Sequence, residues 1–136
     1  MTTFHVAGVP APQGSKNAYR RGGRVVLVES SKKVKPWRAA VAQAATIAYL
    51  HAEPIDGPVT VEVEFILPRP KSLPKRITDM VRKPDLDKLV RSTLDALSGI
   101  AYVDDNRVTR IVATKTYAAS PEDAGATITI TERTTS

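Results

Sequence analysis

Apolar and polar residues alternate with a period of two along residues 59–67, which predicts a β-strand with one face in the core. Glu62 and Glu64 fall on the polar face of this pattern, so we interpret them as solvent-facing residues rather than metal ligands. Other stretches are rich in β-branched or aromatic residues. They predict further strands at residues 3–9, 24–29, 100–103, 108–117 and 126–131.

A hydrophobic period near 3.6 predicts two helices. Over residues 35–51, Trp37 and a row of small alanines share one face, and we expect Trp37 to anchor the core. A second apolar face runs over residues 86–98. Asp85 precedes this face as a suitable N-cap, and Gly99 follows it as a helix stop.

These elements predict one small domain over residues 1–136, of α+β or mixed α/β class, with a mixed sheet of about five strands and two main helices. Prolines and basic residues fill segments 10–23 and 68–83, which predicts two basic loops. We expect the tail at residues 132–136 to fray.

Composition narrows the classes of function. Without cysteine, the chain holds no disulfide, zinc–thiolate site or cysteine nucleophile. His5 and His51 are isolated in the sequence, which disfavours a histidine metal site. There is no run of about eighteen apolar residues, and the first residues lack the features of a signal peptide, so we expect a cytoplasmic protein without a membrane partner.

Positive charge gathers in two segments of a chain whose net charge is +6. Eight Lys or Arg lie between residues 15 and 38, and six lie between residues 69 and 83, against a single acidic residue in each segment. These segments are either solvated loops or a surface that holds phosphates, and their loop location favours the second interpretation. The candidate nucleic-acid contacts are Lys16, Arg20, Arg21, Arg24, Lys71, Lys75, Arg76 and Lys83.

Acidic residues concentrate directly after the second basic segment, where residues 83–107 hold five of the chain's fourteen. Asp85 and Asp87 begin the predicted helix, and Asp104 and Asp105 follow the return segment after it. If the return brings the two ends together, four carboxylates repel one another unless a cation neutralises them. Hard divalent cations prefer oxygen ligands, so the pattern suggests a Mg²⁺ site.

A simpler interpretation also fits each acidic residue taken singly. Asp85 is a helix cap, while Asp87, Arg91 and Asp95 share one stripe of the helix as a surface ladder of ion pairs. The pair Asp104–Asp105 is then part of a turn.

One run of motifs carries a family resemblance: Lys83-Pro84-Asp85-Leu86-Asp87, a basic residue at Arg91, Leu94-Asp95-Ala96-Leu97, and Tyr102-Val103-Asp104-Asp105. This run resembles the RusA family of Holliday junction resolvases, specifically over residues 82–108 and more loosely elsewhere. The resemblance implies a small α/β homodimer, often of phage or prophage origin. Such a protein binds four-way DNA junctions and cuts two opposing strands with Mg²⁺, for which Mn²⁺ substitutes.

By position, the resemblance implies that Asp85, Asp87 and Asp105 are the essential metal-binding carboxylates. The family's catalytic lysine falls on Arg91, which keeps the charge but cannot donate a proton. Lys88 lies one helical turn away, in place of a family asparagine, and either shares this role or leaves it to Arg91. Asp95 and Asp104 are expected to support the ligands.

The implied chemistry is consistent with the residues. Carboxylate-bound metal hydrolyses a phosphodiester without a Ser, Cys or His nucleophile, and the chain suggests none. Two alternatives stay open: a less selective nuclease for branched DNA, and a non-catalytic basic module that binds nucleic acid.

Overall fold

The computed structural model describes residues 1–14, 16–21, 24–29 and 32–133, and it describes side chains outside residues 15–31. The elements are β1 (Thr2–Ala7), β2 (Lys16–Arg21), β3 (Arg24–Glu29), α1 (Val34–Ala48), β4 (Val59–Leu67), α2 (Leu86–Leu97), β5 (Val108–Tyr117) and β6 (Gly125–Glu132), with 3₁₀ turns at Asp105–Arg107 and Pro121–Asp123. The predicted frayed tail lies mostly beyond the described residues.

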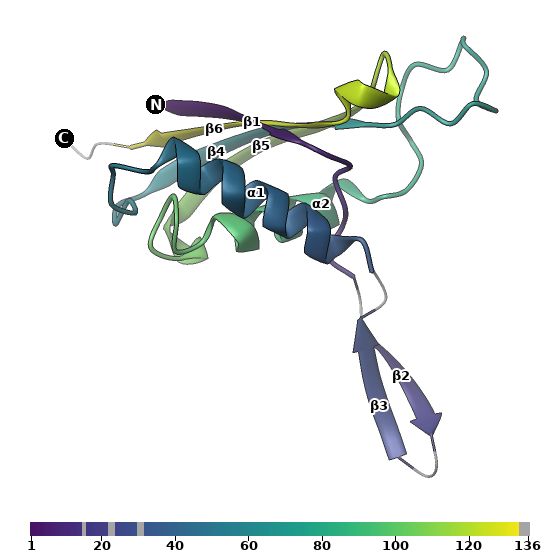
Figure 1. Ribbon diagram of the computed structural model, residues 1–136, viewed down its shortest axis with the longest axis horizontal. Helices are drawn as coiled ribbons and strands as arrows, with labels where there is room; N and C mark the ends of the chain where they lie inside the picture. The colour runs from purple at the N-terminus through teal and green to yellow at the C-terminus, as the bar shows by residue number, and fades with distance from the viewer. Residues whose placement is uncertain (15, 22–23, 30–31, 134–136) are drawn as a thin grey trace.

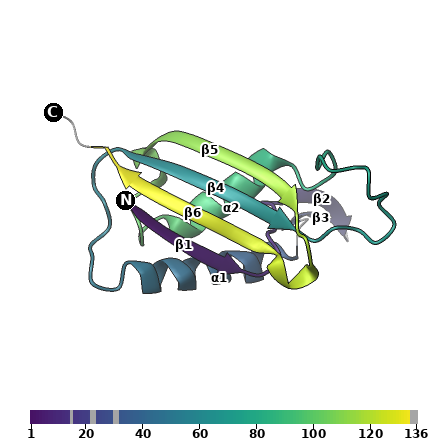
Figure 2. The same ribbon diagram turned by 90° about the horizontal axis from the view of Figure 1, so that it is seen from above.

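The main sheet has four strands in the order β1-β6-β4-β5 (Figure 2). Strands β4 and β5 are parallel, while β6 is antiparallel to both of its neighbours, so the sheet is mixed. This confirms the α+β class but corrects the sheet of about five strands. Strand β3 pairs instead with β2, in a hairpin that projects away from the sheet in Figure 1.

Two local predictions were wrong. Residues 10–23 were expected to be a loop but contain β2. The polar and basic residues of β2 do not alternate with apolar ones, so the pattern that predicts a strand is missing. Residues 100–103 were expected to be a strand but form a turn, in which Tyr102 makes only isolated bridges to Ile55 and Ser98. Gly99, at φ +83°, starts that turn in a conformation that glycine adopts without strain.

Both helices cover one face of the sheet (Figures 1 and 2). The core lies between the layers and includes Val61, Phe65 and Ile128 from the sheet. Glu62 and Glu64 are exposed on the opposite face, which confirms their interpretation as solvent-facing residues.

Trp37 of α1 is 2% exposed, as expected of a core anchor. Its indole Nε1 donates a hydrogen bond to Thr93 Oγ1 of α2 at 3.1 Å, which satisfies both polar groups inside the core. In the described part of the chain, neither helix has the length and apolar character needed to span a bilayer.

The direction of α2 decides where the acidic residues lie. Because β4 and β5 are parallel, the chain must return from the end of β4 to the start of β5, and α2 makes this return. The N-terminus of α2 therefore lies toward the strand ends near Leu67, and its C-terminus lies toward Val108, where β5 begins.

Candidate active site at the two ends of helix α2

The first carboxylates stand at the N-terminal end of α2. Asp85 has the extended backbone of an N-cap residue, and its carbonyl oxygen accepts the first helical hydrogen bond from Leu89 N at 3.1 Å. Its side chain makes no capping hydrogen bond, so the capping role belongs to the backbone alone. Asp85 and Asp87 are both exposed, and the positive end of the helix dipole favours their negative charge.

The basic residues on α2 form little ion pairing with the carboxylates of this end in the described structure. Lys88 Nζ lies 3.8 Å from Asp85 Oδ2, and both side chains are about half exposed, so the pair adds little stability. Arg91 is exposed, and no ion pair joins it to Asp87 or Asp95 in the described structure. The ladder suggested by the helical spacing therefore does not form.

A cavity of about 370 Å³ opens beside Asp85. Its apolar wall includes Pro10, Ala11 and Leu67, and its rim carries Lys33, Lys83 and Lys88. The segment that leads into the β2–β3 hairpin forms part of this wall. That segment is tied to α2 because Ser92 Oγ donates to Ala11 O at 2.7 Å and Gln13 N donates to Lys88 O at 3.0 Å.

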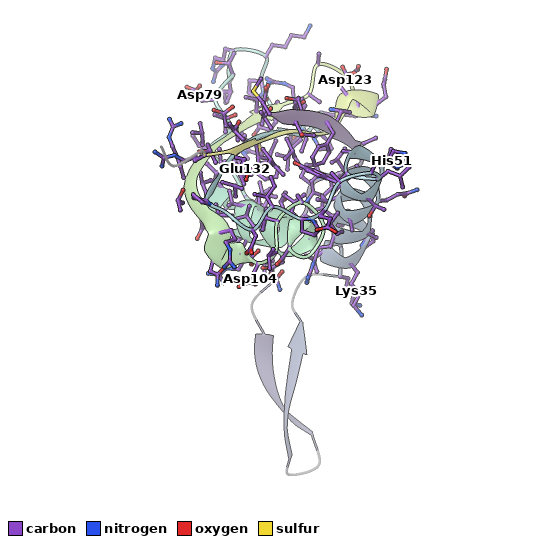
Figure 3. All side chains as sticks on the ribbon, turned by 90° about the vertical axis from the view of Figure 1, so that its left-hand side faces the viewer. Lys35, His51, Asp79, Asp104, Asp123 and Glu132 are labelled. Atoms are coloured by element: carbon purple, nitrogen blue, oxygen red, sulfur yellow. The ribbon has the colours of Figure 1, made fainter. Side chains whose placement is uncertain are left out.

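A second group of carboxylates gathers near the C-terminal end of α2. Tyr102 is fully buried, and its hydroxyl donates to Leu94 O at 2.9 Å, which fixes the turn against the helix. Asp104 and Asp105 follow directly, and Figure 3 shows Asp104 on the helix side of the sheet. The carboxyl group of Asp105 lies near that of Asp95 of α2, close enough for each to act on the other.

The surroundings of Asp105 change its protonation. Burial raises the pKa of Asp105 to about 6; the nearby Asp95 carboxyl group and the charge of Asp104 add to the rise, while the Ser98 side chain opposes it. Burial and the same three carboxylates also raise the pKa of Tyr102. Asp105 Oδ1 is buried and has no hydrogen-bond partner among the described residues. An unpartnered carboxylate oxygen in such a place suits a cation.

The two groups do not merge into one cluster. Among the described residues, no three His, Cys, Asp or Glu side chains are arranged to hold a metal ion by themselves. The return segment brings Asp105 back to Asp95, but Asp87 lies two helical turns farther along, about 12 Å at 1.5 Å per residue. The expectation that the return would gather both ends was thus too simple. The assignment of Asp85, Asp87 and Asp105 as metal ligands stays a prediction.

Two contacts of this region had no signal in the sequence. Arg107 Nη2 lies 2.6 Å from Asp56 Oδ1, and Arg107 Nε donates to the same oxygen at 3.1 Å, which fastens the turn after Asp105. Lys115 of β5 binds two carbonyl groups of the loop before Asp85. Each pair joins residues that are 31 to 51 positions apart, so no local pattern could reveal them.

The predicted nucleic-acid contacts are only partly visible. Lys71, Lys75, Arg76 and Lys83 are exposed in the segment after β4. The side chains of Lys16, Arg20, Arg21 and Arg24 lie outside the described ones, although their backbones form the β2–β3 hairpin. All eight assignments remain predictions.

Comparison with known proteins adds an independent finding. The family described as Endodeoxyribonuclease RusA matches residues 7–131. A curated protein of Bacillus subtilis (strain 168), the uncharacterized protein YqaN, is 30% identical over 128 residues, covering 87% of this chain and 89% of that protein. The family match includes both ends of α2 and the β2–β3 hairpin.

Proposed function

The chain belongs to the RusA family of endodeoxyribonucleases, and from this premise we propose that it resolves four-way (Holliday) DNA junctions by Mg²⁺-dependent phosphodiester hydrolysis in two opposing strands. The observation that carries the proposal is the pairing of exposed aspartates at one end of α2 with the crowded Asp105 at the other. We also propose that the protein acts in the cytoplasm of a bacterium or of a phage-infected host cell.

The carboxylates suit the chemistry of a hard cation. Mg²⁺ is commonly bound by one or two carboxylates, with waters and substrate phosphates completing its shell, so a preassembled group of three is not required. We assign Asp85, Asp87 and Asp105 as ligands of one or two such ions, with Mn²⁺ as a substitute. When bound, the ion supplies an activated water and neutralises charge on the phosphate.

The remaining residues orient the substrate and the ligands. Arg91 is an exposed, permanently charged group midway along α2, where it stabilises negative charge that develops on the phosphate. Lys88 and the lysines around the cavity hold neighbouring phosphates of the strand. Asp95 and Asp104, whose charges act on Asp105, are assigned a supporting role toward it.

A homodimer follows from the symmetry of the substrate. Two opposing strands of a four-way junction are related by a two-fold axis, so two symmetric cuts call for two sites related in the same way. The basic hairpin and the segment after β4 then lie along the DNA arms. Light scattering at micromolar concentration tests this point, and a monomer with or without junction would contradict it.

The decisive experiment is cleavage of a labelled four-way junction, with linear duplex and flap controls, with and without Mg²⁺. Paired symmetric nicks in the junction alone, dependent on metal, are the expected result. Cutting of all branched forms would favour the less selective nuclease. Tight binding without cutting in Mg²⁺ or Mn²⁺ would favour the non-catalytic binding module.

The variant Asp85→Asn separates a ligand from a structural residue. It keeps the size and backbone of the aspartate but removes the charge, so it should abolish cleavage while junction binding stays intact or becomes tighter. Loss of junction binding would instead show that Asp85 supports the fold.

A further inference from the structure

Lys115 on β5 reaches out of its strand to the loop that precedes α2. Its Nζ donates to Arg82 O and to Pro84 O, each at 2.9 Å. The next residue in the chain is Asp85. We propose that Lys115 is a positioning residue that holds Asp85 and Asp87 in the geometry needed to bind the metal, an inference that rests on the function proposed above.

Apart from Met80, which packs against the core, the loop before α2 has few polar contacts to hold it in place. Across residues 78–84, no backbone–backbone hydrogen bond occurs within the described structure. The two bonds from Lys115 therefore connect this stretch to the sheet. The core contacts of Leu86 and Leu89 hold the helix itself, while the bonds from Lys115 fix the chain that enters it at Pro84.

The charge of Lys115 also fits this role. In the described structure its ammonium forms no salt bridge with an acidic side chain, and both of its bonds go to neutral carbonyl oxygens. The positive charge thus stays uncompensated within one residue of Asp85. Hydrogen bonds from a charged donor are stronger than those from a neutral one, so Lys115 is an effective anchor for the loop.

A lysine that only stabilised the fold would have a different signature. Its loss would lower the melting temperature, but folded molecules would bind metal as before. A positioning residue instead changes metal affinity in the folded protein, while saturating metal largely restores the rate. Changes beyond the ligands themselves typically weaken metal affinity by about 10- to 100-fold.

The test compares Lys115→Met with Arg110→Met. Arg110 lies on the same strand, is exposed and loses the same charge, so it serves as the matched control. Mn²⁺ affinity is measured by electron paramagnetic resonance without DNA, and the Mg²⁺ dependence of junction cleavage is measured in parallel. Amide exchange across residues 78–91 is followed in the metal-free protein.

We expect Lys115→Met to weaken Mn²⁺ binding and raise the half-saturating Mg²⁺ concentration by about tenfold or more. Amide exchange at residues 78–91 should quicken, junction affinity in Ca²⁺ should hold, and Lys115→Arg should regain part of the metal affinity because it keeps the charge and can donate to both carbonyls. If Lys115→Met does not fold, Lys115→Gln, which can keep one donor, takes its place.

Unchanged metal affinity and Mg²⁺ dependence in folded Lys115→Met would overturn the inference, as would equal losses in Arg110→Met. These outcomes differ from failure of the proposed function. In that case the wild-type protein itself would neither bind Mn²⁺ nor cleave the junction.

Discussion

The two ends of α2 present the same side chain in contrasting environments. At the N-terminal end, Asp85 and Asp87 are exposed and lie beside a lysine-rimmed cavity. At the C-terminal end, Asp105 lies against Asp95, Asp104 and the buried Tyr102, and its pKa is raised to about 6. The carboxylates at one end are therefore open to solvent, while Asp105 at the other end is partly buried beside further carboxylates.

The difference shows that acidic residues close in sequence can have separate supports. The exposed end depends on a loop anchored by Lys115, whereas the crowded end depends on Tyr102 and on the Arg107–Asp56 ion pair. A substitution at either end should therefore have effects that the other end does not share.

The largest expected effect tests whether both ends serve one reaction. Asp87→Asn and Asp105→Asn should each lower the junction cleavage rate by about 10³-fold, the effect of losing several kcal/mol of charge stabilisation. Asp95→Asn, which changes a neighbour of Asp105, should lose about 10- to 100-fold. The loss in each variant is measured as the single-turnover rate of junction cleavage in Mg²⁺. Near wild-type cleavage by Asp87→Asn would restrict the chemistry to the C-terminal end.

Arg91 lies on α2 between the two acidic ends, and its variants test whether a positive charge there assists cleavage. Removing its charge in Arg91→Gln should slow cleavage by about 10²-fold, because a fixed positive group no longer meets the developing phosphate charge. Arg91→Lys should recover part of that loss. Junction cleavage rates of the two Arg91 variants and the wild type are compared at saturating Mg²⁺. If Arg91→Gln is as fast as the wild type, Lys88→Gln becomes the variant expected to be slow.

Tyr102 tests the support of the crowded end. Tyr102→Phe removes the hydroxyl that donates to Leu94 O and should reduce the free energy of unfolding by about 1 kcal/mol. Tyr117→Phe is the matched control, because no hydrogen bond of the Tyr117 hydroxyl occurs in the described structure, and it should change stability by less than about 0.5 kcal/mol. Urea denaturation gives the free energy of unfolding of both variants. Equal losses of stability would show that the Tyr102 hydrogen bond does not stabilise the turn.

The smallest expected effect is the pH dependence of stability. The native pKa of Asp105 exceeds its ordinary value of 3.8, so the folded protein holds this proton more tightly, and stability from this group falls as pH rises from about 4 through 6. Asp105→Asn removes that loss. Measured by urea denaturation in EDTA, it should gain up to about 1 kcal/mol over the wild type at pH 7.5, after allowance for solvent screening, and little at pH 4.

The control for this measurement comes from the exposed end. Asp85→Asn removes a carboxylate that is about half open to solvent at the other end of α2, and it is measured at the same pH values. A pH-dependent gain in Asp85→Asn that equalled the gain in Asp105→Asn would erase the contrast between the two ends.

The sequence determined the elements whose patterns are local. The alternation over β4 predicted its bounds, and the apolar face and flanking residues of α2 predicted a helix close to Leu86–Leu97. The family motif and its aspartates were also visible, because they form a short run. The family membership that these residues predicted is confirmed by the match over residues 7–131.

Only the tertiary structure decided how those residues are arranged. In the structure, β3 pairs with β2 outside the main sheet, and Asp105 lies near Asp95. Lys115 bonds to a loop more than thirty residues away in the chain. The physical reason is that a helix spaces residues at a constant rise along a rigid axis, so the positions of the two acidic ends depend on where strands β4 and β5 anchor that axis. A one-dimensional pattern records which carboxylates exist. Their separation depends on contacts between segments that are distant in the chain.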